Sequence, residues 1–288
     1  MSVQWFPGHM KESVKILKKA VKKANLVLEI VDARLPFSST NPYTETICRH
    51  IEKIKVMNKS DLADPDITAK WVSYYDEERK EKTFAISALD TGDIRRLSEY
   101  CLSEISVNRA EKLKVIVMGI PNTGKSTLIN SLAGKKVARV GNVPAVTRHN
   151  QRLCVGNRMD VYDTPGILWP VVEPAERGNI LSASGAVSDS AYDYTDIGHF
   201  LAEYLLQRYP GLLGNRYGID ASTHDGLGVL QAIGKKRGCL IKGGRIDLQK
   251  ASEILVNEVR QGKTGRISFE QPEDITQLEK NGTGEISY

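Results

Sequence analysis

The 288-residue chain has few cysteines, few aromatic residues and no long apolar run. Its four cysteines are scattered, without the spacing of a metal site or a disulfide framework, so we expect reduced thiols. No apolar stretch approaches the roughly 20 residues that span a bilayer, and residues 1–15 lack the apolar core of a secretory signal. We therefore expect a cytoplasmic protein with no membrane partner.

The charge balance is modestly basic. Lysine and arginine outnumber aspartate and glutamate by 40 to 35, which gives a formal net charge of +5. This excess permits an anionic partner such as RNA but does not identify one. The length favours about two domains, and no coiled-coil pattern argues for a stable dimer, so we expect a monomer.

Strand-like and helix-like segments alternate over the first 120 residues. The apolar, strand-like runs are residues 25–33, 53–58, 82–87 and 113–119, and the helix-like segments between them are residues 42–52, 66–80 and 91–106. This alternation predicts a doubly wound, mostly parallel α/β sheet. Two further short strands flank Gly156 and Asn157, a spacing typical of an antiparallel hairpin.

The segment "GIPNTGKST" (residues 119–127) fits the phosphate-loop pattern G-x-x-x-x-G-K-[ST] between a strand and a helix. Its glycines let backbone N–H groups surround phosphate oxygens, while Lys125 reaches the β- and γ-phosphates and Ser126 offers a hydroxyl to Mg²⁺. The predicted nucleotide contacts in this loop are Asn122, Thr123, Gly124, Lys125, Ser126 and Thr127.

A second phosphate motif, "DTPG" (residues 163–166), follows a later strand. Asp163 is predicted to hold Mg²⁺, and the Gly166 N–H to contact the γ-phosphate. Alone, these four residues are also a good turn, and the phosphate loop upstream is what favours the functional interpretation. Thr147, between the two motifs, is the candidate for a second hydroxyl ligand of Mg²⁺, although a polar loop threonine often has no such role.

The segment "NKSD" (residues 58–61) predicts the base. An Asp61 carboxylate accepts two hydrogen bonds from guanine, whereas adenine offers no such donor pair. We expect Asn58 to contact the opposite edge of the base, the Lys59 stem to lie along its face, and the "SA" pair Ser87 and Ala88 to give a backbone N–H to it. The predicted ligands are GTP and GDP.

The base-reading motif precedes the phosphate loop, which is the reverse of the usual order in GTP-binding proteins. We interpret this as a circular permutation, which leaves the same site possible because neighbouring strands need not be consecutive. The expected domains are a circularly permuted P-loop GTPase domain at residues 1–172, with a basic N-terminal helix, and a small all-α domain at residues 173–288. Prolines in residues 167–179 disfavour continuous helix and predict a linker there.

Helical periodicity continues through much of the second domain, and the chain beyond Phe269 reads as a loose polar tail. A glycine-rich basic loop lies between its last two predicted helices. Its candidate RNA-backbone contacts are Lys235, Lys236, Arg237, Lys242 and Arg245. On charge alone, a solvated turn is an equally good interpretation, and the same choice applies to the basic N-terminal helix.

Together with "WFPGHM" (residues 5–10) and "VDARLP" (residues 31–36), these motifs resemble bacterial ribosome biogenesis GTPase A, of the YlqF/YawG family of circularly permuted GTPases. The similarity extends over essentially the whole chain. It implies a cytoplasmic factor that binds the large (50S) ribosomal subunit late in its assembly, with a C-terminal helical domain that contacts ribosomal RNA.

Many GTPases place a glutamine after the "DxxG" glycine to orient the attacking water, whereas this chain has Ile167. The resemblance points to His9 as the substitute, with Arg148 and His149 as competitors and simple packing as the alternative for His9. Asn122 resembles the asparagine of potassium-activated GTPases, so K⁺ is expected beside Mg²⁺, although Asn122 also suits a tight turn.

Two functions follow from these residues. The first is a GTP hydrolase that acts as a 50S assembly factor, with turnover stimulated by the ribosomal particle. The second is a GTP-gated RNA-binding module for which hydrolysis is incidental. They differ in whether the partner accelerates hydrolysis.

Overall fold

The structure is a computed structural model that describes residues 17–107, 111–135, 151–164, 166 and 175–275. The predicted site residues His9 and Thr147 lie outside these ranges, as do Arg148, His149 and Ile167. In the described part of the chain, no helix is long and apolar enough to cross a membrane.

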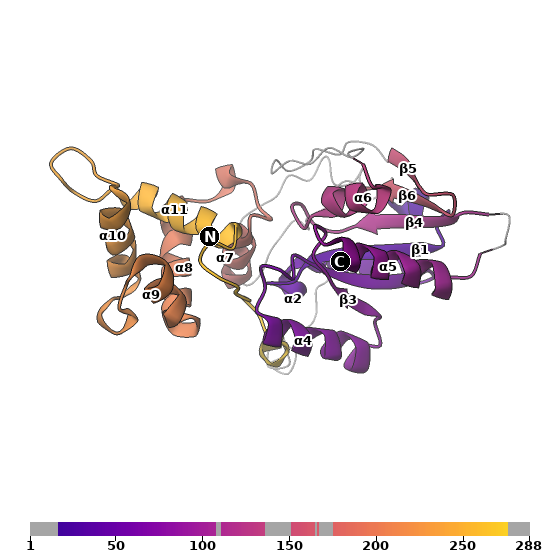
Figure 1. Cartoon of the computed structure of the whole chain (residues 1–288), viewed down its shortest axis with the longest axis horizontal. Coiled ribbons are helices and arrows are strands. Elements are labelled where there is room, and N and C mark those ends of the chain that lie inside the picture. The colour runs from indigo at the N-terminus through magenta and orange to yellow at the C-terminus, as the bar shows by residue number, and fades with distance from the viewer. Residues whose placement is uncertain (1–16, 108–110, 136–150, 165, 167–174, 276–288) are drawn as a thin grey trace. The chain divides into compact units, whose positions relative to one another are not determined.

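A six-stranded sheet in the order β3-β2-β1-β4-β6-β5 forms the N-terminal part (Figure 1). The strands are β1 (Leu26–Asp32), β2 (Glu52–Asn58), β3 (Thr83–Ala85), β4 (Leu113–Met118), β5 (Gln151–Val155) and β6 (Met159–Asp163). All neighbouring pairs are parallel except β5 and β6, which form the predicted hairpin through a turn at Gly156 (φ +55°). The mostly parallel α/β fold is thereby confirmed. The "NKSD" motif begins at the end of β2, and the phosphate loop follows β4. Because β1 pairs with both strands, only β1 lies between them in the sheet.

Short helices connect the strands. They are α2 (Pro36–Ser39), α3 (Pro42–Ile47), α4 (Pro65–Ser73), α5 (Thr91–Glu104) and α6 (Lys125–Ala133). The single helix predicted at residues 42–52 is therefore wrong in length, since α3 ends at Ile47. The helix predicted at residues 66–80 begins at the N-cap Asp64 and changes after Ser73 into a π-helical turn, Tyr74–Glu78.

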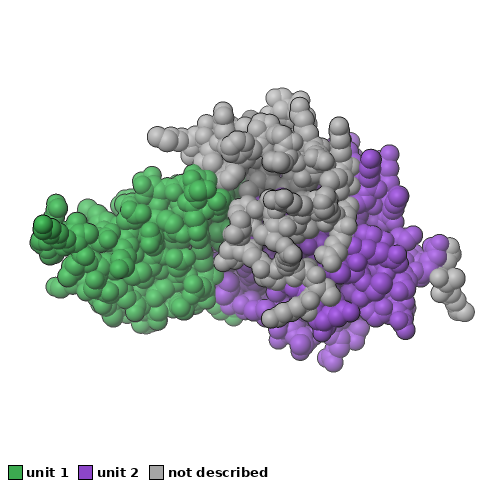
Figure 2. All heavy atoms as spheres, turned by 90° about the horizontal axis from the view of Figure 1, so that it is seen from above, with its two compact units in different colours: residues 1–3, 173–267 green, residues 4–172, 268–288 purple. Residues whose placement is uncertain are grey.

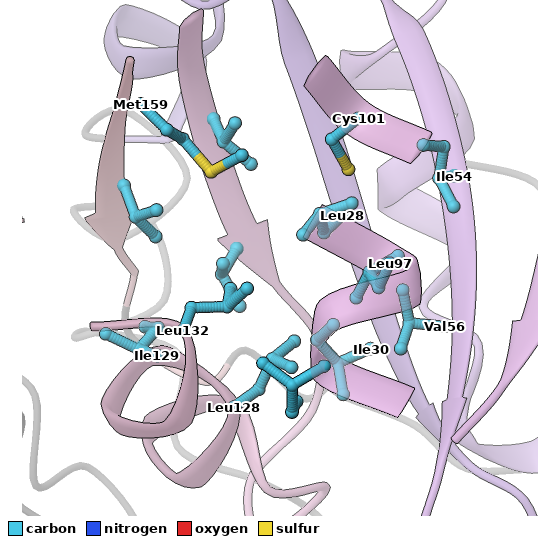
Figure 3. Close-up of a cluster of buried hydrophobic side chains, with 14 of the residues drawn as sticks. Leu28, Ile30, Ile54, Val56, Leu97, Cys101, Leu128, Ile129, Leu132 and Met159 are labelled. Carbon is cyan, nitrogen blue, oxygen red and sulfur yellow. The ribbon is translucent and has the colours of Figure 1, made fainter. Parts of the chain in front are cut away.

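Hydrophobic clusters cover both faces of the sheet. Successive side chains of a strand point to opposite sides, so one strand contributes to both clusters. On one face, Leu28 and Ile30 of β1 pack with Leu97 of α5 and Leu128 of α6 (Figure 3). On the other, Val31 packs in a cluster built around the fully buried Trp71 of α4. Burial of each such side chain contributes about 1.5–3 kcal/mol.

The chain forms two compact units, coloured separately in Figure 2. The helical unit contains α7 (Ala175–Ser184), α8 (Tyr194–Arg208), α9 (Pro210–Tyr217), α10 (Gly226–Arg237) and α11 (Leu248–Arg260), with 3-10 turns at Asp189–Ala191 and Ala221–Thr223. The linker prediction for residues 167–179 is wrong at its C-terminal end, where α7 already begins at Ala175. Proline is tolerated in the first helical turn, so Pro174 does not exclude a helix that starts beside it.

The C-terminal end also differs from the expected domain of residues 173–288 with a loose tail. Residues 268–275 belong to the sheet unit, not the helical unit. The Phe269 N–H donates to the Arg34 carbonyl oxygen at 2.6 Å, and Ile275 is buried in the Trp71 cluster. The predicted loose tail beyond Phe269 is therefore wrong for residues 270–275. Polar groups of this segment form hydrogen bonds with the sheet unit, as Glu270 does with the N–H groups of Phe37 and Ser38.

Candidate nucleotide-binding site

The phosphate loop runs from the end of β4 into α6, and its backbone requires glycine at both ends. At Gly119 (φ +150°), a Cβ would lie 2.2 Å from the Ile30 carbonyl oxygen. At Gly124 (φ +92°), a Cβ would lie 2.2 Å from Asn58 Nδ2. Asn122 between them also has a left-handed backbone, with φ +60°. The loop thus packs against β1 and β2 so closely that a side chain at residue 119 or 124 would clash.

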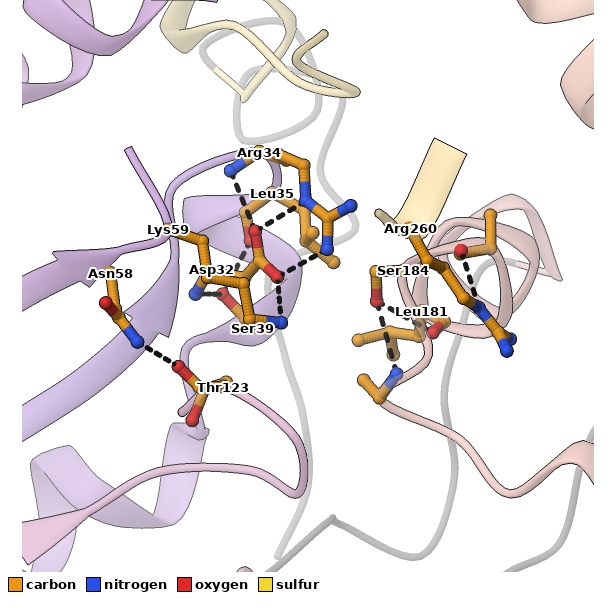
Figure 4. Close-up of polar contacts among 12 residues, drawn as sticks. Asp32, Arg34, Leu35, Ser39, Asn58, Lys59, Thr123, Leu181, Ser184 and Arg260 are labelled. Carbon is orange, nitrogen blue, oxygen red and sulfur yellow. Dashed lines mark hydrogen bonds and ion pairs between the residues drawn. The ribbon is translucent and has the colours of Figure 1, made fainter. Parts of the chain in front are cut away.

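The Asn58 side chain joins the three loops of the site. Its Nδ2 donates to the Thr123 carbonyl oxygen at 2.7 Å (Figure 4), and its Oδ1 accepts from the Ala88 N–H at 2.9 Å. Asn58 is buried, and Ser131 Oγ of α6 donates to the Ala88 carbonyl oxygen at 2.6 Å. The two bonds of the Asn58 amide use Oδ1 and one of the two Nδ2 hydrogens, so the predicted contact of Asn58 with the base stays a prediction. Its observed contacts hold the base-reading loop, the "SA" loop and the phosphate loop together.

Lys59 is fixed by a carboxylate that the sequence analysis did not single out. Its Nζ donates to Asp32 Oδ2 at 2.9 Å, while Arg34 donates to both Asp32 oxygens through Nε (3.0 Å) and Nη2 (2.8 Å) (Figure 4). Burial alone would raise the pKa of Asp32, but the two cations outweigh it and lower that pKa well below its usual range. Lys59 has φ +63°. The signal in the sequence was an aspartate at the end of a buried strand.

The remaining base-reading residues lie at the same edge of the sheet, where the parallel strands β2 and β3 end. Asp61 is exposed, so its carboxylate is accessible to a ligand. Ser87 and Ala88 are buried, and the Ser87 N–H donates to Asp93 Oδ2 at 2.8 Å. The Ser60 N–H donates to the Ile86 carbonyl oxygen at 3.0 Å, which joins the "NKSD" and "SA" loops.

Lys125 is buried at the start of α6, and its Nζ donates to the Ile120 carbonyl oxygen at 2.6 Å. Burial lowers the pKa of Lys125 to about 8, although the negative charge of Asp163 acts in the opposite direction. The "DTPG" segment lies against the same loop, since a Cβ on Gly166 would be 3.0 Å from Lys125 Nζ and 2.9 Å from the Pro121 nitrogen. Thr164 Oγ1 donates to the Val117 carbonyl oxygen of β4 at 2.8 Å.

GTPases generally use Mg²⁺, which prefers hard oxygen ligands. Two of the predicted ligands are described: Asp163, buried at the end of β6, and Ser126, half-buried in the first turn of α6. Val117 of β4 is the register partner of Asp163, so the carboxylate and the phosphate loop emerge from adjacent parallel strands. A carboxylate and a hydroxyl beside a glycine-lined loop fit Mg²⁺ bound together with phosphate. Thr127 follows Ser126 and is also half-buried.

The five cations predicted in the basic loop do not all lie in a loop: Lys235, Lys236 and Arg237 form the last turn of α10, which ends at the C-cap Gly238, and only Lys242 and Arg245 lie in the loop before α11. Arg237 Nη2 pairs with Glu258 at 2.9 Å, and Lys236 Nζ donates to the Tyr217 carbonyl oxygen at 2.8 Å. All five cations are exposed, but Lys235, Lys242 and Arg245 form no ion pair with a residue that the structure describes. The five cations therefore differ in their partners: two are bonded within the unit, and three have no ion-pair partner among the described residues.

Comparisons with known proteins agree with this site. A family model described as "50S ribosome-binding GTPase" matches residues 114–201. Over 284 residues, the chain is 38% identical to ribosome biogenesis GTPase A of Bacillus cereus, covering 96% of each protein. The chain belongs to the ribosome biogenesis GTPase A family. A solved structure described as GDP-bound TM YlqF matches this chain with a TM-score of 0.67 at 29% identity. The match covers 90% of this chain and 99% of the solved one. The crystal structure of GNP-bound YlqF from T. maritima matches with a TM-score of 0.65 at 28% identity, covering 91% and 99%.

As a member of this GTPase family, the chain hydrolyses GTP to GDP and phosphate. In phosphoryl transfer, the protein acts mainly by positioning and by stabilising the charge that develops on the phosphate oxygens. The N–H groups of the phosphate loop and the Lys125 ammonium are suited to that task. Asp163 and Ser126 are the described residues that would hold Mg²⁺, which neutralises phosphate charge when bound.

Proposed function

We propose that this GTPase is an assembly factor for the large (50S) ribosomal subunit, acting in the cytoplasm as a monomer, and that the ribosomal particle stimulates its turnover. The observation that carries the proposal is the match to ribosome biogenesis GTPases over 96% of the chain. The description of the matching family model, a 50S-binding GTPase, agrees with the choice of subunit.

Within this proposal, the GTPase domain is residues 1–172 together with the described residues 268–275, and the helical domain contacts RNA. Lys235, Lys242 and Arg245 are the best candidates for phosphate-backbone contacts, because their charges are exposed and unpaired among the described residues. Lys236 and Arg237 contribute less, since each is already bonded within the unit. Cationic side chains among glycines suit contacts that do not read sequence.

The proposed nucleotide contacts are those of the phosphate, "DTPG", "NKSD" and "SA" motifs, with Mg²⁺ held by Ser126, Asp163 and Thr147. Ile167 can neither donate nor accept a hydrogen bond through its side chain, so another group must orient the attacking water. We assign that role to His9. Asn122 is proposed to help bind K⁺ beside the phosphates, where the cation would stabilise the transition state. Equal turnover in K⁺ and Na⁺ at equal ionic strength would remove that assignment.

The decisive experiment measures GTP turnover with and without purified large ribosomal subunits in potassium buffer. The proposal expects a strong increase with the particle. GTP-dependent binding without an increase would instead support a gated RNA-binding module whose hydrolysis is incidental. Absence of both binding and stimulation would refute the ribosomal partner while leaving the GTPase activity intact.

A matched pair of variants tests the RNA contact. Lys242→Gln removes an exposed charge of the basic loop, and Lys250→Gln removes an exposed charge of α11 outside it. For a lysine that contacts phosphate, the slope of log affinity against log salt should fall by about 1. We expect this change for Lys242→Gln alone. The same slope in both variants and in the wild type would exclude Lys242 from the interface.

A further inference from the structure

Residues 268–275, here called the return segment, follow the helical unit in sequence but belong to the sheet unit. The helical unit is therefore an insertion between two parts of the sheet unit. The return segment is well anchored: the Asp64 N–H donates to Ser268 Oγ at 3.2 Å, and the Phe269 N–H donates to the Arg34 carbonyl oxygen at 2.6 Å. Four of its residues, Ser268, Phe269, Glu270 and Ile275, are at most 7% exposed.

Glu270 makes the most contacts in this segment. Its carboxylate accepts from the Phe37 N–H at 3.0 Å and from the Ser38 N–H at 3.1 Å, both in α2. Its backbone carbonyl oxygen accepts from Trp71 Nε1 of α4 at 3.0 Å. Glu270 therefore joins α2, which directly follows the loop after β1, to α4, the helix that follows the "NKSD" motif. Both are more than 190 residues away in sequence.

These anchors lie on both sides of the base-reading lysine. On one side, the loop after β1 carries Arg34, whose guanidinium grips Asp32, and Asp32 in turn holds Lys59 Nζ. On the other side, the return segment contacts Asp64, five residues after Lys59, through the hydrogen bond from the Asp64 N–H to Ser268 Oγ. The left-handed φ of Lys59 (+63°) shows a backbone held by its surroundings, since a non-glycine residue seldom adopts it unaided.

We propose that the return segment positions Lys59 for guanine, with Glu270 as a positioning residue that acts through the Arg34–Asp32 pair. This inference rests on the proposed stacking of the Lys59 stem on the base. Glu270 does not touch the nucleotide. Its role is to fix the loop after β1, so that Asp32 holds Lys59 in one conformation before the base arrives, which reduces the ordering cost of binding.

Glu270→Gln tests the proposal, with Glu273→Gln as its matched control. Glu270 Oε2 accepts from the N–H groups of both Phe37 and Ser38, and Oε1 accepts from Ser38 alone. A glutamine removes the negative charge and has a single accepting oxygen, so its NH₂ would replace Oε1 and face the Ser38 N–H, and at least one accepting contact is lost. Glu273 belongs to the same segment, but its carboxylate forms an exposed ion pair with Lys70. Both variants should have the urea-unfolding midpoint measured first. If Glu270→Gln does not fold, Glu270→Asp keeps both oxygens on a shorter side chain and takes its place.

The measured quantities are the affinities for GDP and for inorganic tripolyphosphate, which has no base. We expect Glu270→Gln to lower the affinity for GDP roughly fivefold to tenfold and the affinity for tripolyphosphate less than about twofold. Glu273→Gln should leave both affinities unchanged. In the Lys59→Ala background, Glu270→Gln should cause no further loss, because the two residues act in series.

Three results would overturn the positioning role. They are equal behaviour of Glu270→Gln and Glu273→Gln, an equal loss for both ligands, and a loss that adds fully to that of Lys59→Ala. If Lys59→Ala by itself leaves GDP affinity unchanged, the proposed base contact of Lys59 fails first, and the positioning role fails with it. That result is distinguishable because it appears in the single variant.

Discussion

The buried Lys125 ammonium should make nucleotide binding depend on pH in a defined window. Burial lowers the pKa of Lys125 to about 8, with Asp163 raising it and Lys59 lowering it further. A bound phosphate adds negative charge beside Nζ and favours the ammonium form. At any pH where Lys125 is neutral in the nucleotide-free site, the protein must therefore take up a proton when the nucleotide binds. The perturbation is simply a change of pH from 7 to 8.5.

The size of the effect follows from the pKa. With a value of about 8, the neutral fraction of Lys125 in the empty site is about one tenth at pH 7, about one half at pH 8 and about three quarters at pH 8.5. Proton uptake on binding should rise through the same fractions. If only the ammonium form binds phosphate, GDP affinity at pH 8.5 is about fourfold below its low-pH plateau.

Isothermal titration calorimetry measures this uptake directly when GDP is titrated in two buffers of different ionisation enthalpy at each pH. Lys125→Met is the control, because it has no proton to gain and should show no uptake at any pH. A wild-type uptake that stays near zero from pH 7 to 8.5 would refute the reasoning. It would mean that the empty site already holds a fully charged lysine.

Four further outcomes follow from the same contacts. Between pH 8 and 10.5 the unfolded chain holds more protons on Lys125 than the folded one, so the stability of the nucleotide-free protein should rise with pH there, as urea unfolding would show. Asn58→Ala leaves the Ala88 N–H and the Thr123 carbonyl oxygen without their partner and should cost about 1–3 kcal/mol in urea unfolding, whereas unchanged stability would contradict the bridging role. Gly124→Ala forces a Cβ into Asn58 at a left-handed φ and should cost at least about 1–3 kcal/mol by the same assay. The hydrogen bond from Arg216 to Glu258 lowers the pKa of that carboxyl to about 2. The ionised Glu258 therefore stabilises the folded chain above pH 4.5, and this contribution is lost as the pH falls towards 2. Glu258→Gln should reduce the acid sensitivity of unfolding in that window.

Much of the fold was accessible from local sequence patterns. Each of the six strands lies where the sequence predicted one: β1 to β4 follow mainly apolar runs, and β5 and β6 follow the hairpin spacing around Gly156. The phosphate loop was equally clear, since a Cβ at residue 119 would meet the Ile30 carbonyl oxygen and one at residue 124 would meet the Asn58 side chain, both at positive φ. The helix limits were less accurate. The helix α3 ends at Ile47, ahead of β2, which begins at Glu52, and α7 begins at Ala175 because proline is tolerated at a helix start.

Contacts between distant residues could not be predicted in this way. Nothing local distinguishes a glutamate in a polar tail from Glu270, whose partners Phe37 and Ser38 are more than 230 residues earlier. Nothing in the sequence indicates which protein groups the Asn58 amide bonds to, and only the tertiary structure brings Thr123 and Ala88 to it.

The sequence by itself determined the ligand class, the order of the motifs and the type of sheet, because glycine loops, carboxylates and apolar runs carry these properties within a few residues. The tertiary structure decided how the motifs hold one another: that Asp32 fixes Lys59, that Asn58 joins three loops, and that the chain returns after residue 267 to complete the sheet unit. Hydrogen bonds and ion pairs of this kind depend on distances of about 3 Å, which the packing of the whole sheet unit sets.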